Sequence, residues 1–319
     1  MKKMKKTNLF AVLALAATPA FLHAQTTSYS DIVGYYKKTF PAGGSLQSVA
    51  LLKPVTFQGS ATSISAAVLT SNGANWSANA FVPVNGLPAY YVEITSGPRE
   101  GYLYDIVSNT ANTVTVDDSS IADAGATPSF IIRAHSKLSD VLGPTVVMGD
   151  FQDQATVYNS DGTYSNFLRD SSTTTGWLDA TLFSESDAVI YPGQGYVLTS
   201  SASGNYTVSG TLKSTKTAVP LFPNVPNIVS LANPGGVSKD VQSVNLGANM
   251  ADFQDQVAKY NDDGSLTLAV NLLYSGSAEG FYDATTFSPA SGVTVAGEEA
   301  VIATVVSPTV WVVNPPVSQ

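Results

Sequence analysis

Short runs of alternating hydrophobic and polar residues, bounded by turn-forming residues, recur along the chain. Residues 89–95, 102–107 and 113–117 are such runs, and segments rich in Gly, Pro or Asn separate them. Runs of this length at such close spacing are typical of a β-meander or a small barrel. Residues 31–36 and 46–51 are two further β-forming runs, so the pattern predicts strands in this part of the chain as well.

One stretch of the sequence occurs twice. Residues 148–162 return as residues 250–264, and ten of the fifteen positions are identical. Asp-Gly follows each motif between strand-like runs, which predicts a tight hairpin at both places. A second pair of related stretches, residues 177–184 and 281–288, has an offset of 104 instead of 102. Repetition at a nearly constant spacing indicates an internal duplication.

A third pair of similar segments indicates where an insertion lies. Residues 48–54 resemble residues 228–234 at an offset of 180, so about 78 extra residues lie within the first copy. We therefore predict an all-β fold with two related β repeat units and a small β-barrel or meander inserted in the first. The predicted parts are a signal peptide at 1–24, a first repeat at 25–54 plus 136–213, the insertion at 55–135 and a second repeat at 214–319.

The first residues have the features of a secretory signal peptide. Four Lys within the first six residues precede an apolar run at 9–22, and Ala24 offers a small residue for cleavage before Gln25. The run is shorter than the roughly 20 residues of a transmembrane helix, and no later stretch reaches that length. We expect an exported protein, in the periplasm, on the outer cell surface or secreted, with no transmembrane segment in its mature form.

The net charge and the residue types present limit the ligands and cofactors that the protein can bind. Removal of residues 1–24 takes four Lys and no acidic residue, which leaves 11 Lys and Arg against 24 Asp and Glu and a net charge of −13. Such a surface is a poor partner for nucleic acid. The chain has no Cys, and His135 is the one histidine after residue 24, so we expect no metal site of several Cys or His. Without a phosphate-binding loop or dinucleotide fingerprint, we also expect no cofactor.

Aromatic residues are candidates for a binding face. Tyr90, Tyr91, Tyr102 and Tyr104 lie on predicted strands of the insertion, and Trp177 begins the second repeated motif. Aromatic rings pack on the apolar faces of sugars, so these side chains could contact an extracellular glycan or a protein surface. The alternative interpretation is that they fill the core, because burial explains most Tyr residues in strands.

The duplication also places carboxylates at equivalent positions. Bilobal aspartic proteases take one catalytic Asp from each lobe. The candidate pairs here are Asp150 with Asp252, Asp153 with Asp255, and Asp179 with Asp283. None of them lies in an Asp-Thr-Gly or Asp-Ser-Gly motif. Repeated Asp residues also accept backbone hydrogen bonds at turns. The sequence thus favours a non-enzymatic binding or surface protein over an acid hydrolase that acts on an extracellular glycoprotein such as mucin.

The order of the motifs resembles a family of exported proteins found in Verrucomicrobia. The residues that carry this resemblance are 32–35, 90–97, 108–113, the two Asp-Gln motifs and 192–196. The second copy departs from the Pro-Gly-Gln-Gly sequence of residues 192–195. The resemblance implies export, and it brings no catalytic residue to this chain.

Overall fold

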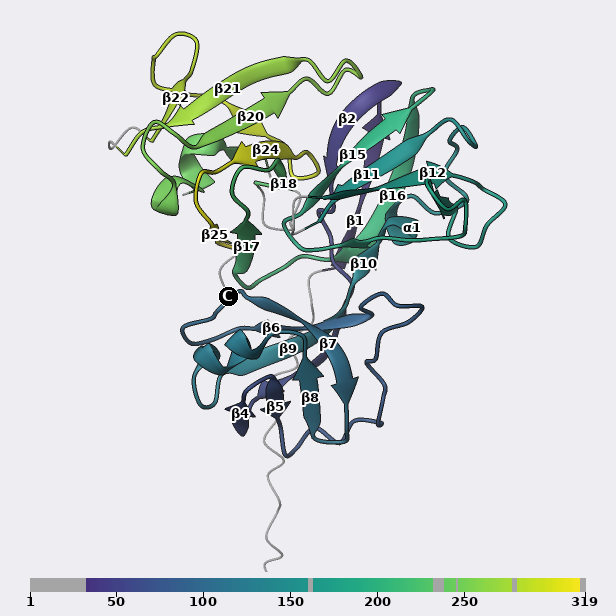
Figure 1. The fold of residues 1–319 in the computed structure, drawn as a ribbon, viewed down its shortest axis with the longest axis vertical. Coiled ribbons are helices and arrows are strands. Elements are labelled where there is room, and N and C mark those ends of the chain that lie inside the picture. The colour runs from purple at the N-terminus through teal and green to yellow at the C-terminus, as the bar shows by residue number, and fades with distance from the viewer. Residues whose placement is uncertain (1–32, 160–162, 232–237, 245, 277–279, 316–319) are drawn as a thin grey trace, which may run out of the picture. The chain divides into compact units, whose positions relative to one another are not determined.

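Strands dominate the computed structural model, which describes residues 33–159, 163–231, 238–244, 246–276 and 280–315 (Figure 1). The helices in these segments are short: α1 (Leu138–Val141), η1 (Ser119–Ala124), η2 (Val241–Val244) and η3 (Leu246–Asn249). The all-β prediction is confirmed. The predicted signal peptide and its cleavage site lie outside the described residues.

The first set of strands combines segments from both sides of the insertion. β13 (Trp177–Asp179), β12 (Tyr164–Arg169), β11 (Gln154–Tyr158), β15 (Gly195–Ser200) and β2 (Gly43–Ser48) form an antiparallel sheet in that order. Two smaller sheets accompany it, β1 (Val33–Phe40) with β16 (Gly204–Thr211) and β10 (Ser136–Lys137) with β14 (Val189–Ile190). The two strands that precede the insertion, β1 and β2, thus pair with strands that follow it.

The second set has the same arrangement. Its large sheet has the order β22 (Phe281–Asp283), β21 (Leu268–Tyr274), β20 (Gln256–Tyr260), β24 (Val301–Thr304) and β18 (Asn227–Val229). Its small sheets are β17 (Thr217–Leu221) with β25 (Thr309–Val313) and β19 (Lys239–Asp240) with β23 (Thr294–Val295). Each sheet of one set therefore has a counterpart of equal strand order in the other, which is what two copies of one unit would produce.

The strand register corrects one of the sequence alignments. Leu46 pairs with Val197, and Ile228 pairs with Ile302, which occupies the equivalent place in its sheet. β2 and β18 are consequently related by an offset of 182, not the predicted 180. A shift of two residues leaves the alternation of inward and outward side chains unchanged, so hydrophobic pattern alone does not distinguish the two alignments.

The connection between β20 and β21 differs from the predicted tight hairpin. Asn261 N donates to Thr267 O at 3.0 Å, so the turn spans a longer loop in which Gly264 has φ +90°. Gly264 O accepts a hydrogen bond from Gly44 N at 2.8 Å, which ties this loop to β2 of the first set. The Asp-Gly pair of the first copy, residues 161 and 162, lies outside the described residues.

The insertion forms a seven-stranded antiparallel sheet of its own. The strand order is β3 (Val55–Ser60), β9 (Ser129–Ala134), β6 (Tyr90–Ile94), β7 (Leu103–Asn109), β8 (Thr113–Val116), β5 (Val68–Thr70) and β4 (Ser63–Ser65). Only Ala61 and Thr62 separate the two edge strands, β3 and β4, along the chain. Because consecutive Cα atoms are about 3.8 Å apart, the edges must lie close together, and the sheet is strongly curled.

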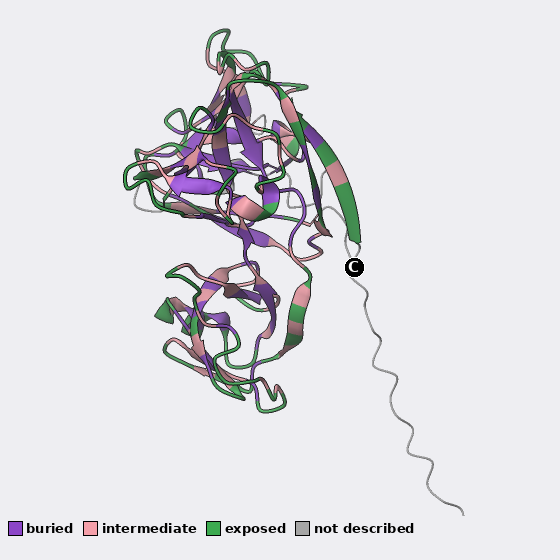
Figure 2. Ribbon diagram, turned by 90° about the vertical axis from the view of Figure 1, so that its right-hand side faces the viewer, coloured by how far each residue is buried: buried purple, intermediate pink, exposed green. Residues whose placement is uncertain are grey.

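Buried hydrophobic side chains in the described segments gather in three large clusters, one in each strand set and one in the insertion. Figure 2 shows buried positions along the strands and exposed positions along many of the connecting loops. A smaller cluster of Leu46, Ile228 and Ala300 joins the two strand sets. Matched backbone bonds flank it, from Ser48 N to Glu298 O at 3.0 Å and from Ser230 N to Gly193 O at 2.9 Å.

A buried ion pair links the insertion to the segment after β16. Lys213 Nζ donates to a carboxylate oxygen of Glu93 on β6, and both side chains are fully buried. Lys213 Nζ also donates to Thr215 Oγ1 at 2.7 Å. Burial lowers the pKa of Lys213, although the negative charge of Glu93 opposes this shift.

Candidate functional site

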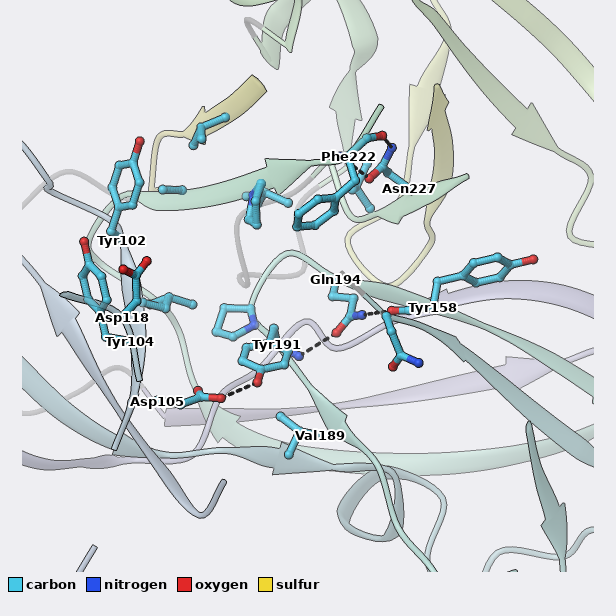
Figure 3. Close-up of a pocket in the computed structure, with 18 of the residues that line it drawn as sticks. Tyr102, Tyr104, Asp105, Asp118, Tyr158, Val189, Tyr191, Gln194, Phe222 and Asn227 are labelled. Carbon is cyan, nitrogen blue, oxygen red and sulfur yellow. Dashed lines mark hydrogen bonds between the residues drawn. The ribbon is translucent and has the colours of Figure 1, made fainter. Parts of the chain in front are cut away.

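A cleft of about 600 Å³ receives side chains from the insertion and from both strand sets (Figure 3). The insertion contributes β7, the residues after β8 and the start of η1. The first set contributes the end of β11 and the loop between β14 and β15, and the second set contributes β17, β18 and Val310 of β25. Clefts of this size that combine aromatic and polar groups are the usual form of small-ligand sites.

The Asp105 side chain of the cleft joins two other segments of the chain. Its Oδ2 accepts a hydrogen bond from Tyr191 Oη at 2.6 Å, and its Oδ1 lies 2.9 Å from His135 Nε2. Tyr191 comes from the loop before β15, whereas His135 directly follows β9. Burial, then the negative charge of Asp105, raises the pKa of Tyr191, so this hydroxyl stays protonated and donates its hydrogen.

Two further carboxylates follow β8. Asp105 N donates to Asp117 Oδ1 at 3.0 Å, so the backbone of β7 fixes the Asp117 side chain. Asp118 caps η1 by accepting hydrogen bonds from Ser120 N and Ser120 Oγ, both at 2.8 Å. These bonds lower the pKa of Asp118, whereas burial and then the charge of Asp105 raise the pKa of Asp117. The cleft therefore holds an ionised carboxylate directly beside one that retains its proton to higher pH.

Aromatic rings with partly exposed surface line the same cleft. Tyr102, Tyr158 and Phe222 come from the insertion, the first strand set and the second strand set, respectively, and each is partly exposed. The Arg99 guanidinium covers one face of Tyr102 at 4.7 Å from the ring centroid and binds Asp123 at 2.5 Å. The rings thus provide apolar contact surface next to hydrogen-bonding groups, which is the combination that sugar ligands require.

Two amide side chains hold the loops that carry these rings. Gln194 Oε1 accepts from Tyr191 N at 3.1 Å, and its Nε2 donates to Tyr158 O at 2.8 Å (Figure 3). Asn227 Oδ1 accepts from Phe222 N at 2.8 Å, and its Nδ2 donates to Phe222 O at 2.9 Å. Both amides are committed to the protein backbone, so their effect on a ligand is through the rings that they position.

The aromatic residues that the sequence analysis proposed as ligand contacts differ in their burial and in their position relative to the cleft. Tyr102 and Tyr104 line the cleft, but Tyr104 is 3% exposed and belongs to the insertion core with the partly buried Tyr90. Tyr91 is 1% exposed, and Trp177 is fully buried, with its Nε1 donating to Leu142 O at 2.9 Å. The expectation of ligand contact is wrong for Tyr91 and Trp177, because core packing encloses both rings.

The duplicated Asp residues accept backbone hydrogen bonds from loops of their own strand sets. Asp150 accepts from Ser171 N at 2.8 Å, and its counterpart Asp252 accepts from Gly276 N at 2.7 Å. Asp179 and Asp283 each accept from the backbone amides two and three residues later, at 2.7–2.9 Å: Thr181, Leu182, Thr285 and Thr286. These bonds are of the kind that the structural interpretation predicts, since Asp179 and Asp283 stabilise local turns, whereas Asp150 and Asp252 each join two loops of one strand set.

Sequence reasoning did not select Asp105, Asp117 and Tyr191 as site residues. The sequence did contain an indication for Tyr191. This residue directly precedes the Pro-Gly-Gln-Gly motif, which is present in the first copy and absent from the second, so the motif distinguishes the first copy. From the sequence, His135 was considered as a possible metal ligand, and its contact with Asp105 requires strands that are distant in sequence. Within the described segments, no group of three or more His, Asp or Glu side chains is arranged to hold a metal ion.

Among the same residues, no helix has the length and hydrophobicity needed to cross a bilayer. Comparisons of this chain with protein-family models, with curated proteins and with solved structures gave no match. The resemblance to exported proteins of Verrucomicrobia therefore stays a prediction.

Proposed function

We propose that the protein is an exported binding protein that takes a neutral or positively charged glycan segment in the cleft. The observation that carries the proposal is the meeting of Tyr102, Tyr158 and Phe222 with the carboxylates of Asp117 and Asp118 in a space of about 600 Å³. Partly exposed rings offer stacking surface, and carboxylates accept hydrogen bonds from sugar hydroxyl groups.

The charge of the cleft supports a ligand without negative charge. Asp105, Asp117 and Asp118 all line it, whereas the guanidinium of Arg99 is paired with Asp123. The whole chain carries a net charge of −9, which repels anionic ligands at long range. Export is proposed from the N-terminal residues alone, and an extracellular or envelope glycan is the ligand that such a location supplies.

Titration calorimetry with neutral oligosaccharides and chitosan oligomers tests this proposal. We expect Tyr102→Ala and Phe222→Ala each to weaken binding at least tenfold, because each removes a ring from the cleft wall. Tyr35→Ala is the matched control, since Tyr35 is 80% exposed on β1 and lies outside the cleft. Equal affinity of the cleft variants and the control, with unchanged melting temperatures, would show that the ligand does not bind in the cleft.

Acid hydrolysis is a second candidate function for the same cleft. Asp117, with its raised pKa, could donate a proton, while Asp105 stays close by and fixed by its bonds to Tyr191 and His135. Casein and mucin incubated with the protein from pH 3 to 7 distinguish the two functions. A binding protein leaves both substrates intact, whereas a hydrolase cleaves them and loses that activity in Asp117→Asn.

A further inference from the structure

Four phenylalanines lie on the surface in a backbone conformation that Phe rarely adopts. Phe151 and Phe253 belong to the Asp-Gln motifs and have φ of 57° and 52°, with 58% and 54% of their surface exposed. Phe183 and Phe287 follow β13 and β22 and have φ of 50° and 51°, with 64% and 67% exposed. Such left-handed positions normally hold Gly or Asn.

The local bonding is the same in both strand sets. Phe151 N donates to Arg169 O and Phe253 N donates to Tyr274 O, both at 2.8 Å. In the other pair of turns, Phe183 N and Phe287 N each donate to the carbonyl of the Asp four residues earlier, both at 2.9 Å. The four rings are therefore exposed at equivalent places in the two strand sets.

Folding gains little from a Phe at these positions. A bulky side chain costs conformational free energy in the left-handed region, and an exposed ring recovers only a part of it by burial. Glycine or asparagine would form the same turns at a lower cost. Observed strain of this kind, present in two different turns of both sets, points to a role for the rings outside the folded core.

The neighbouring groups indicate the chemistry of the partner. The carboxylates beside the rings, Asp150, Asp179 and Asp283, accept backbone amide hydrogens. Hydrogen bonds lower the pKa of Asp150 and Asp283, so these ionised groups can also accept hydrogen bonds from sugar hydroxyl groups. Gln152 and Gln254, which follow two of the rings, are exposed and neutral. A ring next to neutral hydrogen-bonding groups suits a neutral sugar, and the net charge of −9 disfavours an anionic lipid surface.

We propose that these four rings are stacking platforms for a neutral polysaccharide chain, with two platforms on each strand set and separate from the cleft. This inference shares the ligand class of the proposed function but uses different residues. Because both strand sets present the same pair of rings, we expect a long polysaccharide that contacts both sets to gain avidity that a short oligosaccharide does not.

Retention on insoluble cellulose, amylose and chitin tests the platforms. In the variant F151N/F183N/F253N/F287N we expect retention to fall at least tenfold, with a melting temperature equal to or above that of the natural chain, because Asn tolerates the left-handed region. The matched variant with Tyr at all four positions keeps the rings and should keep the retention. Variants with Asn in one strand set only should lose avidity and bind at an intermediate level.

Several outcomes would overturn the inference. They are a natural chain that none of the three polysaccharides retains, an Asn variant retained as well as the natural chain, and a Tyr variant that loses retention as the Asn variant does. Flotation with phosphatidylcholine vesicles, or self-association in gel filtration, that disappears only in the Asn variant would assign the rings to a lipid surface or to a second copy instead. The Asn variant keeps the cleft intact, so calorimetry with soluble oligosaccharides on this variant tests binding in the cleft alone. A failure of the cleft proposal can therefore be distinguished from a failure of the platform proposal.

Discussion

At the scale of single residues, the repeated Asp of the Asp-Gln motif is a structural anchor. Asp153 is fully buried and accepts hydrogen bonds from Gly149 N at 2.7 Å, Ser200 Oγ at 2.8 Å and Ser201 N at 2.6 Å. Asp255 is 2% exposed and accepts from Ala251 N and Val306 N at 2.7 and 2.8 Å. Each carboxylate therefore joins the motif to the end of a strand in its own sheet.

We expect Asp153→Asn and Asp255→Asn each to lower the free energy of unfolding by about 1–3 kcal/mol at pH 7, because the amide leaves buried donors unsatisfied. Asp123→Asn, at an exposed ion pair, should cost less than about 1 kcal/mol. Urea denaturation followed by circular dichroism provides the measurement. A cost at Asp153 no larger than at Asp123 would contradict the anchoring role.

The same residue predicts a dependence of stability on pH. Burial alone would raise the pKa of Asp153, but the hydrogen bonds from Ser201, Gly149 and Ser200 together lower it. A carboxyl whose pKa is lower in the folded state stabilises the protein above the unfolded pKa of about 3.9, and this contribution is lost as pH falls through the folded value. The natural chain should lose stability more steeply below about pH 4 than Asp153→Asn does in the same urea series.

At the scale of elements, β15 approaches the second strand set too closely for a side chain. A Cβ at Gly195 would lie 2.6 Å from Ala300 Cβ, 2.7 Å from Ile228 Cγ2 and 2.9 Å from Gln47 O. The contact between the two strand sets therefore depends on a residue that lacks a side chain, and one methyl group is enough to disturb it.

Gly195→Ala should lower the free energy of unfolding by about 1–3 kcal/mol through overpacking. Gly34→Ala is the matched control, since Gly34 also lies in a strand but has nothing within 4 Å of its added Cβ. Differential scanning calorimetry of both variants provides the comparison. Equal melting temperatures would show that the strand sets separate readily at β15.

The strand pattern could be predicted from the sequence because alternation and turn residues are local signals. The site could not, since Asp105, His135 and Tyr191 meet only after distant strands have paired. Alternation in the insertion predicts two faces of a strand but not which face the core covers, so Tyr91 and Tyr102 looked equivalent. The left-handed backbone of Phe151 leaves no sequence signal either, because Phe is not a residue that such turns favour.

At the scale of the whole molecule, the ion pair of Lys213 and Glu93 fastens the insertion to the chain that enters the second strand set. Neither side chain has contact with water, so loss of one partner leaves an uncompensated charge in the interior. Lys216 offers a contrast nearby, since its Nζ lies 2.9 Å from Glu100 Oε2 in a partly exposed pair.

Lys213→Met should therefore cost about 3–5 kcal/mol of unfolding free energy, and Glu93→Leu combined with Lys213→Met should recover much of it because neither charge is left buried alone. Lys216→Met should cost no more than about 1 kcal/mol. Guanidinium denaturation and limited proteolysis near residue 213 measure both effects. A double variant as unstable as the single one would show that packing around Lys213, not its charge, holds the insertion.

The discontinuous first set imposes an order on events during synthesis. β2 leaves the ribosome before the whole insertion, yet its partner β15 is made only after residue 194, and β1 waits until β16 is complete at residue 211. At about 5–20 residues per second, the unpaired strands wait roughly 10–30 s. The insertion contains all strands of its own sheet and is free to fold in that interval, so the nascent chain presents a finished domain beside two open strand edges. Pairing of β1 and β2 with their partners is therefore a late step that follows formation of the insertion sheet.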